Sequence, residues 1–496
     1  MFFKLPLQFS FIRIDITHRW LPGGNKMPVQ KKDRLFFFLA QLMILTFLTV
    51  FFIKLCPLTI FDADDWALIR GERLPIPIWH GWNPTRVLPE TLYPFCGRVA
   101  AVLFYPLTGD FVQAVRISCA IVVSLFITAL CMAMYRFLQH RFSIPTEVSL
   151  LLEICFLAGC FLIFRTRPTS SYLFRADNLT CVIYYTCSGV LNGIVILLMA
   201  ADADLNKCWK GAALWKKILF GILVYFAVFS NLFHSGMLAV FCFVSLFSDL
   251  KSRPSFQTWL KQHLMYLVIL GGFLIACIFE YFGGRANVVD DGGMDFLGCA
   301  RQLWTMVRAL SKPYIAVLLF LLAAVIVFRR RDAKARNLLL IFLAYEILIT
   351  CYLFLLCSKV LYMSRVEASF GIWLGLVVLE IICLALLAEH IQKSNLQRNL
   401  VLLVTALSIV FTILPDGRYQ RSLTTALGPE ASEEMDETLI SAITEADREG
   451  QDSVTVDLNG LAQRSDLLLT EGIGQIVSDT LYYYGITENH ISVTVR

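Results

Sequence analysis

Apolar stretches recur along the chain between residue 35 and residue 414, and short polar breaks separate them. A helix needs about 20 apolar residues to cross the hydrocarbon layer of a membrane. The pattern therefore predicts an all-α polytopic membrane protein with about eleven transmembrane helices. The expected spans are 35–56, 111–134, 146–164, 179–200, 217–230, 235–248, 263–280, 313–329, 338–357, 367–388 and 400–414.

The polar breaks between the spans alternate in charge. One set is basic and includes RFLQHR (136–141), KCWKGAALWKK (207–217) and RRRDAKAR (329–336). Because loops rich in Lys and Arg remain in the cytoplasm, this set is predicted to face inward and the other set outward. The outward segments are then 57–110, 165–178, 281–304 and 358–366.

The stretch 217–248 allows two interpretations. Two spans, 217–230 and 235–248, are each short for a full crossing, and NLFHSG (231–236) would then be a turn covered by protein. A single long tilted span is the alternative. It would reverse the orientation of everything downstream and place RRRDAKAR outside, which the charge bias disfavours, so we expect two spans.

The pattern changes after the last span, and residues 415–496 are predicted to form a small acidic α/β domain outside the cytoplasm. ASEEMDETLISAITEADREG is amphipathic like a helix, while SVTVDL and HISVTV alternate like strands. EGIGQIVSDTLYYYGI lies between them as a helix ending at Gly485, so parallel strand pairing is expected. From Asp416 onward the chain has fifteen acidic and five basic residues, a net charge of −10. We expect an accessory role.

The composition excludes several classes of function. With 57% hydrophobic residues, 16% charged residues and a mean hydropathy of +0.66, most of the chain cannot form a water-soluble globule. The fifteen cysteines have no metal or redox spacing, and His80 and His234 have no partner at ligand spacing, so no metal site of that type is predicted. No nucleic-acid partner is predicted, and any cofactor is unknown. Asp290, Asp291 and Asp295 lie among glycines and could bind a divalent cation, although a solvated loop is the commoner explanation of such a segment.

Residues 1–34 are predicted to be a basic cytoplasmic leader to the transmembrane domain, residues 35–414. The first apolar run is too long for a signal peptide and lacks a small-residue cleavage site, so we expect an uncleaved first span. Met27 opens the basic segment MPVQKKDR, and we interpret it as the true start of the chain.

A cluster of carboxylates follows the first span directly, in the large first outer loop, 57–110. Asp62, Asp64 and Asp65 open the stretch FDADDWALIRGERLPIPIWHGWNPTRVLPE. They are consistent with a helix start, in which Asp62 caps an interfacial helix. Three acids at a membrane edge also repel each other, which raises the pKa of at least one carboxyl, as a general base requires. Both interpretations stay open.

The run DDWALIRGERLPIPIWHGWNPTRVLPETLYPFCGR resembles the first outer loop of the GT-C glycosyltransferases, and more narrowly that of the serotype-converting O-antigen glucosyltransferase group. The resemblance implies a GT-C-like fold in a bacterial plasma membrane. It implies transfer of a sugar from a polyprenyl-phosphate carrier to an extracytoplasmic cell-envelope glycan, with inversion. Asp64 or Asp65 would then deprotonate the acceptor, and a helix starting near Asp62 favours Asp65.

Arginines in the outer segments are candidates for holding the donor phosphate, because the planar guanidinium binds phosphate with two parallel hydrogen bonds. The alternative is that they contact lipid headgroups or pair with Asp177, Asp290 or Glu367. Arg175 adds to the basic character of 165–178. The candidate phosphate ligands are Arg86, Arg98, Arg165, Arg167, Arg285 and Arg365.

Aromatic residues of the first outer loop are candidates for stacking on a sugar ring. They are Trp66, Trp79 and Trp82, and an interfacial aromatic belt explains them equally well. Two other functions compete with glycosyl transfer. A transporter or flippase of lipid-linked or small polar substrates would explain a broken helix within 217–248. A polysaccharide polymerase would also need outer arginines, although the early acidic pair is less expected there.

Overall fold

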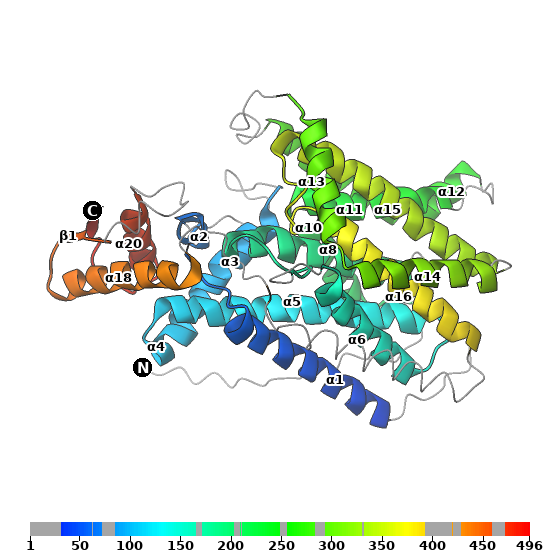
Figure 1. The fold of residues 1–496 in the computed structure, drawn as a ribbon, viewed down its shortest axis with the longest axis horizontal. Helices are drawn as coiled ribbons and strands as arrows, with labels where there is room; N and C mark the ends of the chain where they lie inside the picture. Colours follow the sequence, from blue (N-terminus) through cyan, green and yellow to red (C-terminus); the bar gives the residue numbers. More distant parts are fainter. Residues whose placement is uncertain are drawn as a thin grey trace.

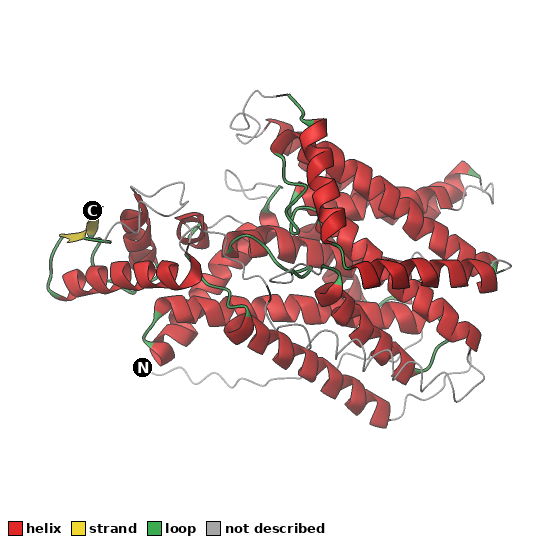
Figure 2. Ribbon diagram, in the orientation of Figure 1, coloured by secondary structure: helices red, strands yellow, loops and turns green. Residues whose placement is uncertain are grey.

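The structure is a computed structural model, and its described part is almost entirely helical, with one two-stranded sheet (Figure 2). The residues that it describes are 31–61, 63–71, 85–164, 171–202, 209, 211–248, 255–282, 293–329, 332–391, 419, 428–458 and 472–496.

Long apolar helices form a bundle, and the C-terminal residues lie against one end of it (Figure 1). The helices of the bundle are, in chain order, α1 (Lys31–Val50), η1 (Phe51–Leu55), α2 (Ala63–Ile69), α3 (Val87–Val99), η2 (Ala100–Phe104), α4 (Tyr105–Thr108), α5 (Phe111–Arg141), α6 (Thr146–Leu162), α7 (Leu179–Cys181), η3 (Val182–Thr186), α8 (Cys187–Ala201), α10 (Leu214–Val228), α11 (Leu232–Ser248), α12 (Phe256–Phe282), α13 (Phe296–Ala309), α14 (Lys312–Arg329), α15 (Ala333–Val360) and α16 (Phe370–Ile391).

The bundle has the helices of an integral membrane protein. Among the described residues, 7 helices are long and apolar enough to cross a membrane, and Leu232–Phe247 and Lys312–Phe328 are shorter apolar helices. The predicted polytopic all-α class fits this arrangement. The predicted span 400–414 lies outside the described residues, so the expected total of about eleven spans stays a prediction.

The first outer segment differs from the prediction. Residues 57–110 were expected to form a loop, but α3, η2 and α4 run on from one another as an apolar helix, Val87–Thr108, of 22 residues. Its mean hydropathy is 1.2, whereas α5 reaches 2.5. Charged residues at its first turns and Pro94 inside it made the apolar pattern weak, which is why the sequence read as a loop.

The stretch 217–248 forms two helices, α10 and α11, as expected. The break between them is stabilised by α8, because the amide of Asn192 donates to the carbonyl of Ala227 at 3.1 Å and to the hydroxyl of Ser230 at 3.1 Å. On the far side of the break, the side chain of Asn231 accepts from the N–H of Phe233 at 3.0 Å. Polar groups freed by a broken helix are thus paired within the protein, as an apolar environment requires.

The ends of the helices sort into two groups that match the predicted alternation of the breaks. At one end, which we call the α2 end, two contacts join predicted outward segments, Asp177–Arg365 and Asp295–Ser358. Two more involve residues that follow or precede such segments, Asp65–Thr180 and Phe164–Leu310. At the opposite end, His140 lies 3.5 Å from Asp202, and the N–H of Ser143 donates to Glu389. The expected outward segments therefore meet at a single end of the bundle.

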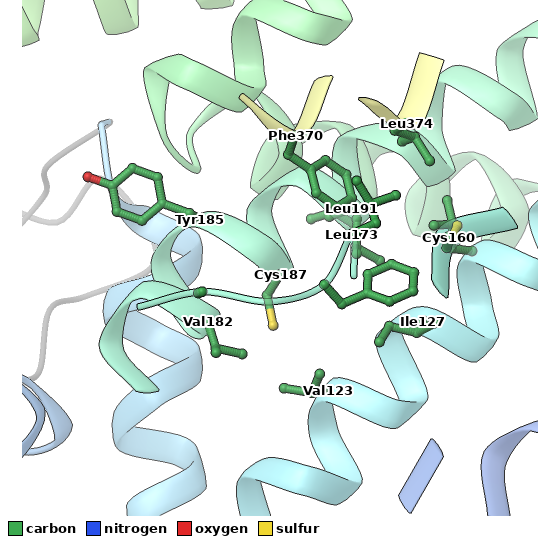
Figure 3. Packing of buried hydrophobic residues seen from close by; sticks show 14 of the residues in the cluster. Val123, Ile127, Cys160, Leu173, Val182, Tyr185, Cys187, Leu191, Phe370 and Leu374 are labelled. Atoms are coloured by element: carbon green, nitrogen blue, oxygen red, sulfur yellow. The ribbon is translucent and has the colours of Figure 1, made fainter. Parts of the chain in front are cut away.

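The core of the bundle lies where α5, α6, α8 and α16 meet (Figure 3). Leu173 enters this core from the segment before α7 and lies among side chains of all four helices. A Cβ on Gly189 would meet the ring of Phe370 at 2.5 Å, and one on Gly193 would meet Leu374 at 2.7 Å. Glycine on α8 is thus what lets α16 approach closely, as in other membrane helix pairs.

The chain after the bundle forms a compact α/β arrangement, which we call the C-terminal segment (428–458 and 472–496). It comprises α18 (Gly428–Arg448), β1 (Ser453–Val456), α20 (Ile473–Tyr483) and β2 (Ser492–Val495). The strands pair in parallel with Ser453 opposite Ser492, as the sequence predicts. The valines of β2 pack close to Gly474 on α20, which leaves the serines and threonines of both strands on the outer face.

Candidate functional site

The predicted acid cluster lies on α2, and the structure separates its members. Asp65 is fully buried; its Oδ1 accepts a hydrogen bond from the N–H of Thr180 at 2.6 Å, and its Oδ2 accepts one from the N–H of Phe61 at 3.4 Å. Thr180 belongs to the first turn of the continuous helix Leu179–Ala201, where N–H groups lack intrahelical partners and the helix dipole favours a carboxylate. Asp65 therefore attaches α2 to the start of a core helix.

This environment does not fit the predicted preference for Asp65 as the general base. A base must reach the acceptor hydroxyl, whereas Asp65 is enclosed and already accepts two backbone N–H groups. Asp64 is exposed at the α2 end of the bundle. Successive residues of a helix point about 100° apart, so burying Asp65 turns Asp64 outward. Of the two predicted catalytic carboxylates, Asp64 is the accessible one.

Trp66 does not fit its predicted role in stacking on a sugar. Its side chain is fully buried, its Nε1–H donates to Asp436 of α18 at 3.2 Å, and its ring lies 6.1 Å from that of Phe111. An indole with no exposed face cannot stack on a ligand in this conformation. Its apolar body and single N–H donor instead join α2 to the C-terminal segment.

A second group of charged residues lies close by, on the segments that precede α7 and α16, and we call it the Arg365 cluster (Arg175, Asp177, Arg365 and Glu367). The Nε of Arg365 lies 2.7 Å from Asp177 and 3.2 Å from Glu367, and Arg175 lies 3.4 Å from Asp177. The guanidinium of Arg365 also covers the ring of Tyr362, 4.6 Å from its centroid. The alternative prediction, pairing of Arg365 with Asp177 and Glu367, is thus correct in this structure.

The Arg365 cluster retains capacity for an anion. The hydrogen bond from Arg365 to Asp177 uses Nε, while its Nη2 lies 4.0 Å from the sulfur of Cys181. Nε of Arg175 has no hydrogen-bond partner among the described residues. The terminal nitrogens of Arg365, which its hydrogen bond to Asp177 does not use, are the donors left for a phosphate oxygen, whereas Nε of Arg175 is buried.

Burial sets the protonation state of the cluster. The pKa of Glu367 is raised to about 7: burial is the main cause, the charge of Asp177 adds to the rise, and the charge of Arg365 opposes it. The carboxylates Glu367 and Asp177 raise the pKa of Arg365 despite its burial, so Arg365 stays charged. With Glu367 protonated, two arginines face one carboxylate and the cluster has a net charge of +1. With Glu367 ionised the net charge is zero, so the cluster favours anions more below about pH 7 than above it.

The acid on α2 and the Arg365 cluster are joined through a short stretch of chain. Asp65 binds the N–H of Thr180, and the side chain of Asn178 accepts from the N–H of Cys181 at 2.7 Å. Asp177, the next residue back, pairs with Arg365. An accessible carboxylate and a cationic cluster therefore lie at the same end of the bundle, fixed to the same helix start.

The other predicted arginines that are described do not join the cluster. Arg86 precedes α3 and lies 3.9 Å from Glu90, one helical turn away. Arg98 is exposed on α3, within electrostatic reach of the hydroxyl of Tyr484. Both belong to α3 or its start, whereas Arg365 lies on the segment before α16. Five predicted site residues lie outside the described residues, as does Asp62; they are Arg165, Arg167, Arg285, Trp79 and Trp82.

Several residues at this end were not identified from the sequence as site residues. Tyr362 has no sequence feature that marks it as a site residue, and Asp436 is one of many acids in the tail. The partner of Asp436, Trp66, is 370 positions away in the chain. A sequence gives no signal for contacts at such separation. Among the described residues, no group of three or more His, Cys, Asp or Glu could hold a metal ion.

Comparison with known proteins adds no identification. No protein-family model matches the chain, and no curated protein matches it.

Proposed function

We propose that this protein is an integral membrane glycosyltransferase of the GT-C type. It would move a sugar from a polyprenyl-phosphate carrier to an extracytoplasmic glycan of a bacterial cell envelope. The observation that supports the proposal is that the exposed Asp64 and the Arg365 cluster lie at the same end of the bundle, because α2 is bonded through Asp65 to the helix start that follows Asp177. The C-terminal segment lies at this end and would be extracytoplasmic too.

The proposed chemistry divides between the two groups. Asp64 accepts the proton of an acceptor hydroxyl as its oxygen bonds to the anomeric carbon of the sugar. The bond from that carbon to the phosphate oxygen breaks, and polyprenyl phosphate leaves with the electron pair. The charge that grows on the leaving phosphate is stabilised by Arg365 and Arg175. Attack opposite the leaving group inverts the anomeric centre.

The bilayer supplies the carrier to such a site. A polyprenyl chain stays in the hydrocarbon layer and its phosphate at the membrane surface, so the enzyme needs cations near the ends of its spanning helices. Arg365 and Glu367 lie between the candidate spans Ala333–Val360 and Phe370–Glu389, and Arg175 lies shortly before Leu179–Ala201. Cationic groups at span ends meet this requirement.

The test uses the full chain in nanodiscs, loaded with radiolabelled polyprenyl-phosphate glucose as the first probe and other hexoses after it. Bacterial envelope glycans are added as acceptors. The expected result is release of polyprenyl phosphate with label moving to the glycan. If no polyprenyl-phosphate hexose is consumed with any acceptor, the proposal is wrong.

The competing transporter function has one observation in its favour, the polar break between α10 and α11. Liposomes that carry the same lipid in one leaflet separate the two functions. Movement of intact polyprenyl-phosphate sugar between leaflets, without cleavage of the sugar–phosphate bond, would support a flippase. Cleavage without such movement supports the transferase.

A further inference from the structure

The C-terminal segment contacts α2 along the whole of that short helix. Before α2, the hydroxyl of Thr59 donates to Glu433 at 3.2 Å. Within α2, Trp66 donates to Asp436. Just after α2, Arg70 lies 2.9 Å from Asp479. Three successive points of the chain around Asp64 are therefore held by the C-terminal segment.

The end of α2 depends on this contact in a more specific way. The last carbonyls of a helix have no intrahelical donor, and α2 has only 7 residues. The hydroxyl of Tyr484 donates to the carbonyl of Ile69 at 2.6 Å, and that of Thr480 lies 2.8 Å from the carbonyl of Trp66. A helix this short is not stable alone in water, so donors from the C-terminal segment stabilise its end.

The membrane bundle is shaped to admit Tyr484. Gly97 of α3 lies against its hydroxyl, so closely that a Cβ there would overlap it. The ring of Phe111, the first residue of α5, lies 5.7 Å from Tyr484 and 6.1 Å from Trp66. Arg116 of α5 binds Glu433 at 2.6 Å. The C-terminal segment is therefore seated on α2, α3 and α5 together.

We propose that the C-terminal segment is a positioning element of the catalytic site, with Tyr484 and Thr480 holding α2 so that Asp64 faces the acceptor. The inference rests on the proposed function of Asp64 for its catalytic part. The sequence predicts only an accessory role for the C-terminal segment, and this proposal makes that role specific: the segment positions α2. Tyr484 and Thr480 act through α2 and are positioning residues.

The first test measures backbone amide hydrogen exchange in α2 of the full chain in nanodiscs. Tyr484→Phe removes one hydroxyl, and Tyr483→Phe makes the same change at an exposed neighbour as a matched control. Loss of the bond to Ile69 should raise exchange in α2 on the order of tenfold, since a hydrogen bond contributes about 1 kcal/mol. The Tyr483→Phe variant should exchange at the wild-type rate. Thr480→Val provides a second variant at the same helix end.

The second test separates kcat from KM in glycosyl transfer. Loosening the end of α2 displaces the base, while the bond of Asp65 to Thr180 and the ion pairs of the Arg365 cluster remain. We therefore expect kcat to fall several-fold in Tyr484→Phe while the KM for the lipid donor is unchanged. If Tyr484 served stability alone, Tyr484→Phe would reduce the amount of folded protein. The kcat per folded molecule would then equal that of the wild type. Raised exchange with unchanged kcat would overturn the positioning role, as would unchanged exchange in both Tyr484→Phe and Thr480→Val. A wild-type protein without transferase activity but with the predicted exchange pattern would refute the proposed function and leave the attachment of α2 supported.

Discussion

Two regions at the same end of the bundle are built in opposite ways. α2 is held by hydrogen bonds to backbone carbonyls, by the indole N–H of Trp66 and by packing on Phe111. The Arg365 cluster is held almost wholly by ion pairs among two arginines and two carboxylates. The first arrangement fixes geometry, and the second changes its charge with pH.

The difference is visible in the two buried carboxyls. Burial raises the pKa of Asp436 well above its usual value, and the hydrogen bond from Trp66 only partly opposes this. Burial also raises the pKa of Glu367, but the nearby charge of Arg365 limits the rise to about 7. The pKa of Asp436 is thus raised with no arginine of the described residues close enough to oppose the rise, whereas that of Glu367 is limited to about 7. In the proposed function, Asp64 must stay in one position, which a rigidly held α2 provides. The Arg365 cluster must bind and release a phosphate, which a change in its charge would assist.

Three variants distinguish the Arg365 cluster from α2, and of these Arg365→Lys is expected to have the largest effect. Lysine keeps the charge, but its single ammonium cannot contact Asp177, Glu367 and a phosphate as the guanidinium does. Donor use should fall on the order of tenfold or more, measured as kcat/KM for the lipid donor. Arg301→Lys, an exposed arginine on α13 at the same end, is the matched control and should behave as wild type. Equal activity of the two variants would reduce the Arg365 cluster to a structural role.

A smaller effect is expected when the α2 contact is disturbed from the side of the bundle. In Gly97→Ala the added methyl group occupies the position of the Tyr484 hydroxyl, so the bond to Ile69 is lost without any change in the C-terminal segment. The free energy of unfolding should fall by about 1–3 kcal/mol, measured by thermal unfolding in detergent. Gly221→Ala is the control, since a Cβ there meets open space. If both variants have the wild-type melting temperature, the close seating of Tyr484 on α3 is wrong.

The smallest effect is a pH dependence confined to the Arg365 cluster. The pKa of Glu367 rises from 4.5 in the unfolded chain to about 7 in the folded protein, so the folded state binds the proton more tightly. Stability contributed by this proton is fully present below about pH 4.5 and is lost as pH rises to about 7. Glu367→Gln should remove that decline in melting temperature, while Asp436→Asn should not alter it within this range. An unchanged decline in Glu367→Gln would contradict the assignment.

Much of the fold was predictable, because membrane spans and strand alternation are local patterns. The parallel pairing of β1 with β2 and the break between α10 and α11 followed from such patterns. Val87–Thr108 did not, since charges and Pro94 interrupt its apolar run. The choice between Asp64 and Asp65 could not be made from the sequence for a different reason. It depended on the helix start to within one residue, and a shift of one position rotates a side chain by about 100°.

The site was predictable only as a set of residue types. Pairing of outer arginines with Asp177 or Glu367 was one predicted alternative, but the sequence did not indicate which arginine makes the pair across 188 positions. The burial of Trp66 was not predictable, because its partner, Asp436, lies in a segment that showed no chemical motif. Contacts between distant segments depend on packing of the whole molecule, which one sequence does not reveal.

The most direct test of the account compares Asp64→Asn with Asp65→Asn for sugar transfer and thermal stability, with Asp110→Asn as control because asparagine also caps α5. Asp64→Asn should keep the wild-type melting temperature and lose transfer by on the order of 10²-fold or more, as expected for removal of a general base. Asp65→Asn should lower the free energy of unfolding by about 1–3 kcal/mol, because a buried acceptor of two N–H groups is impaired. Wild-type transfer by Asp64→Asn would contradict the central claim that this exposed carboxylate is the base.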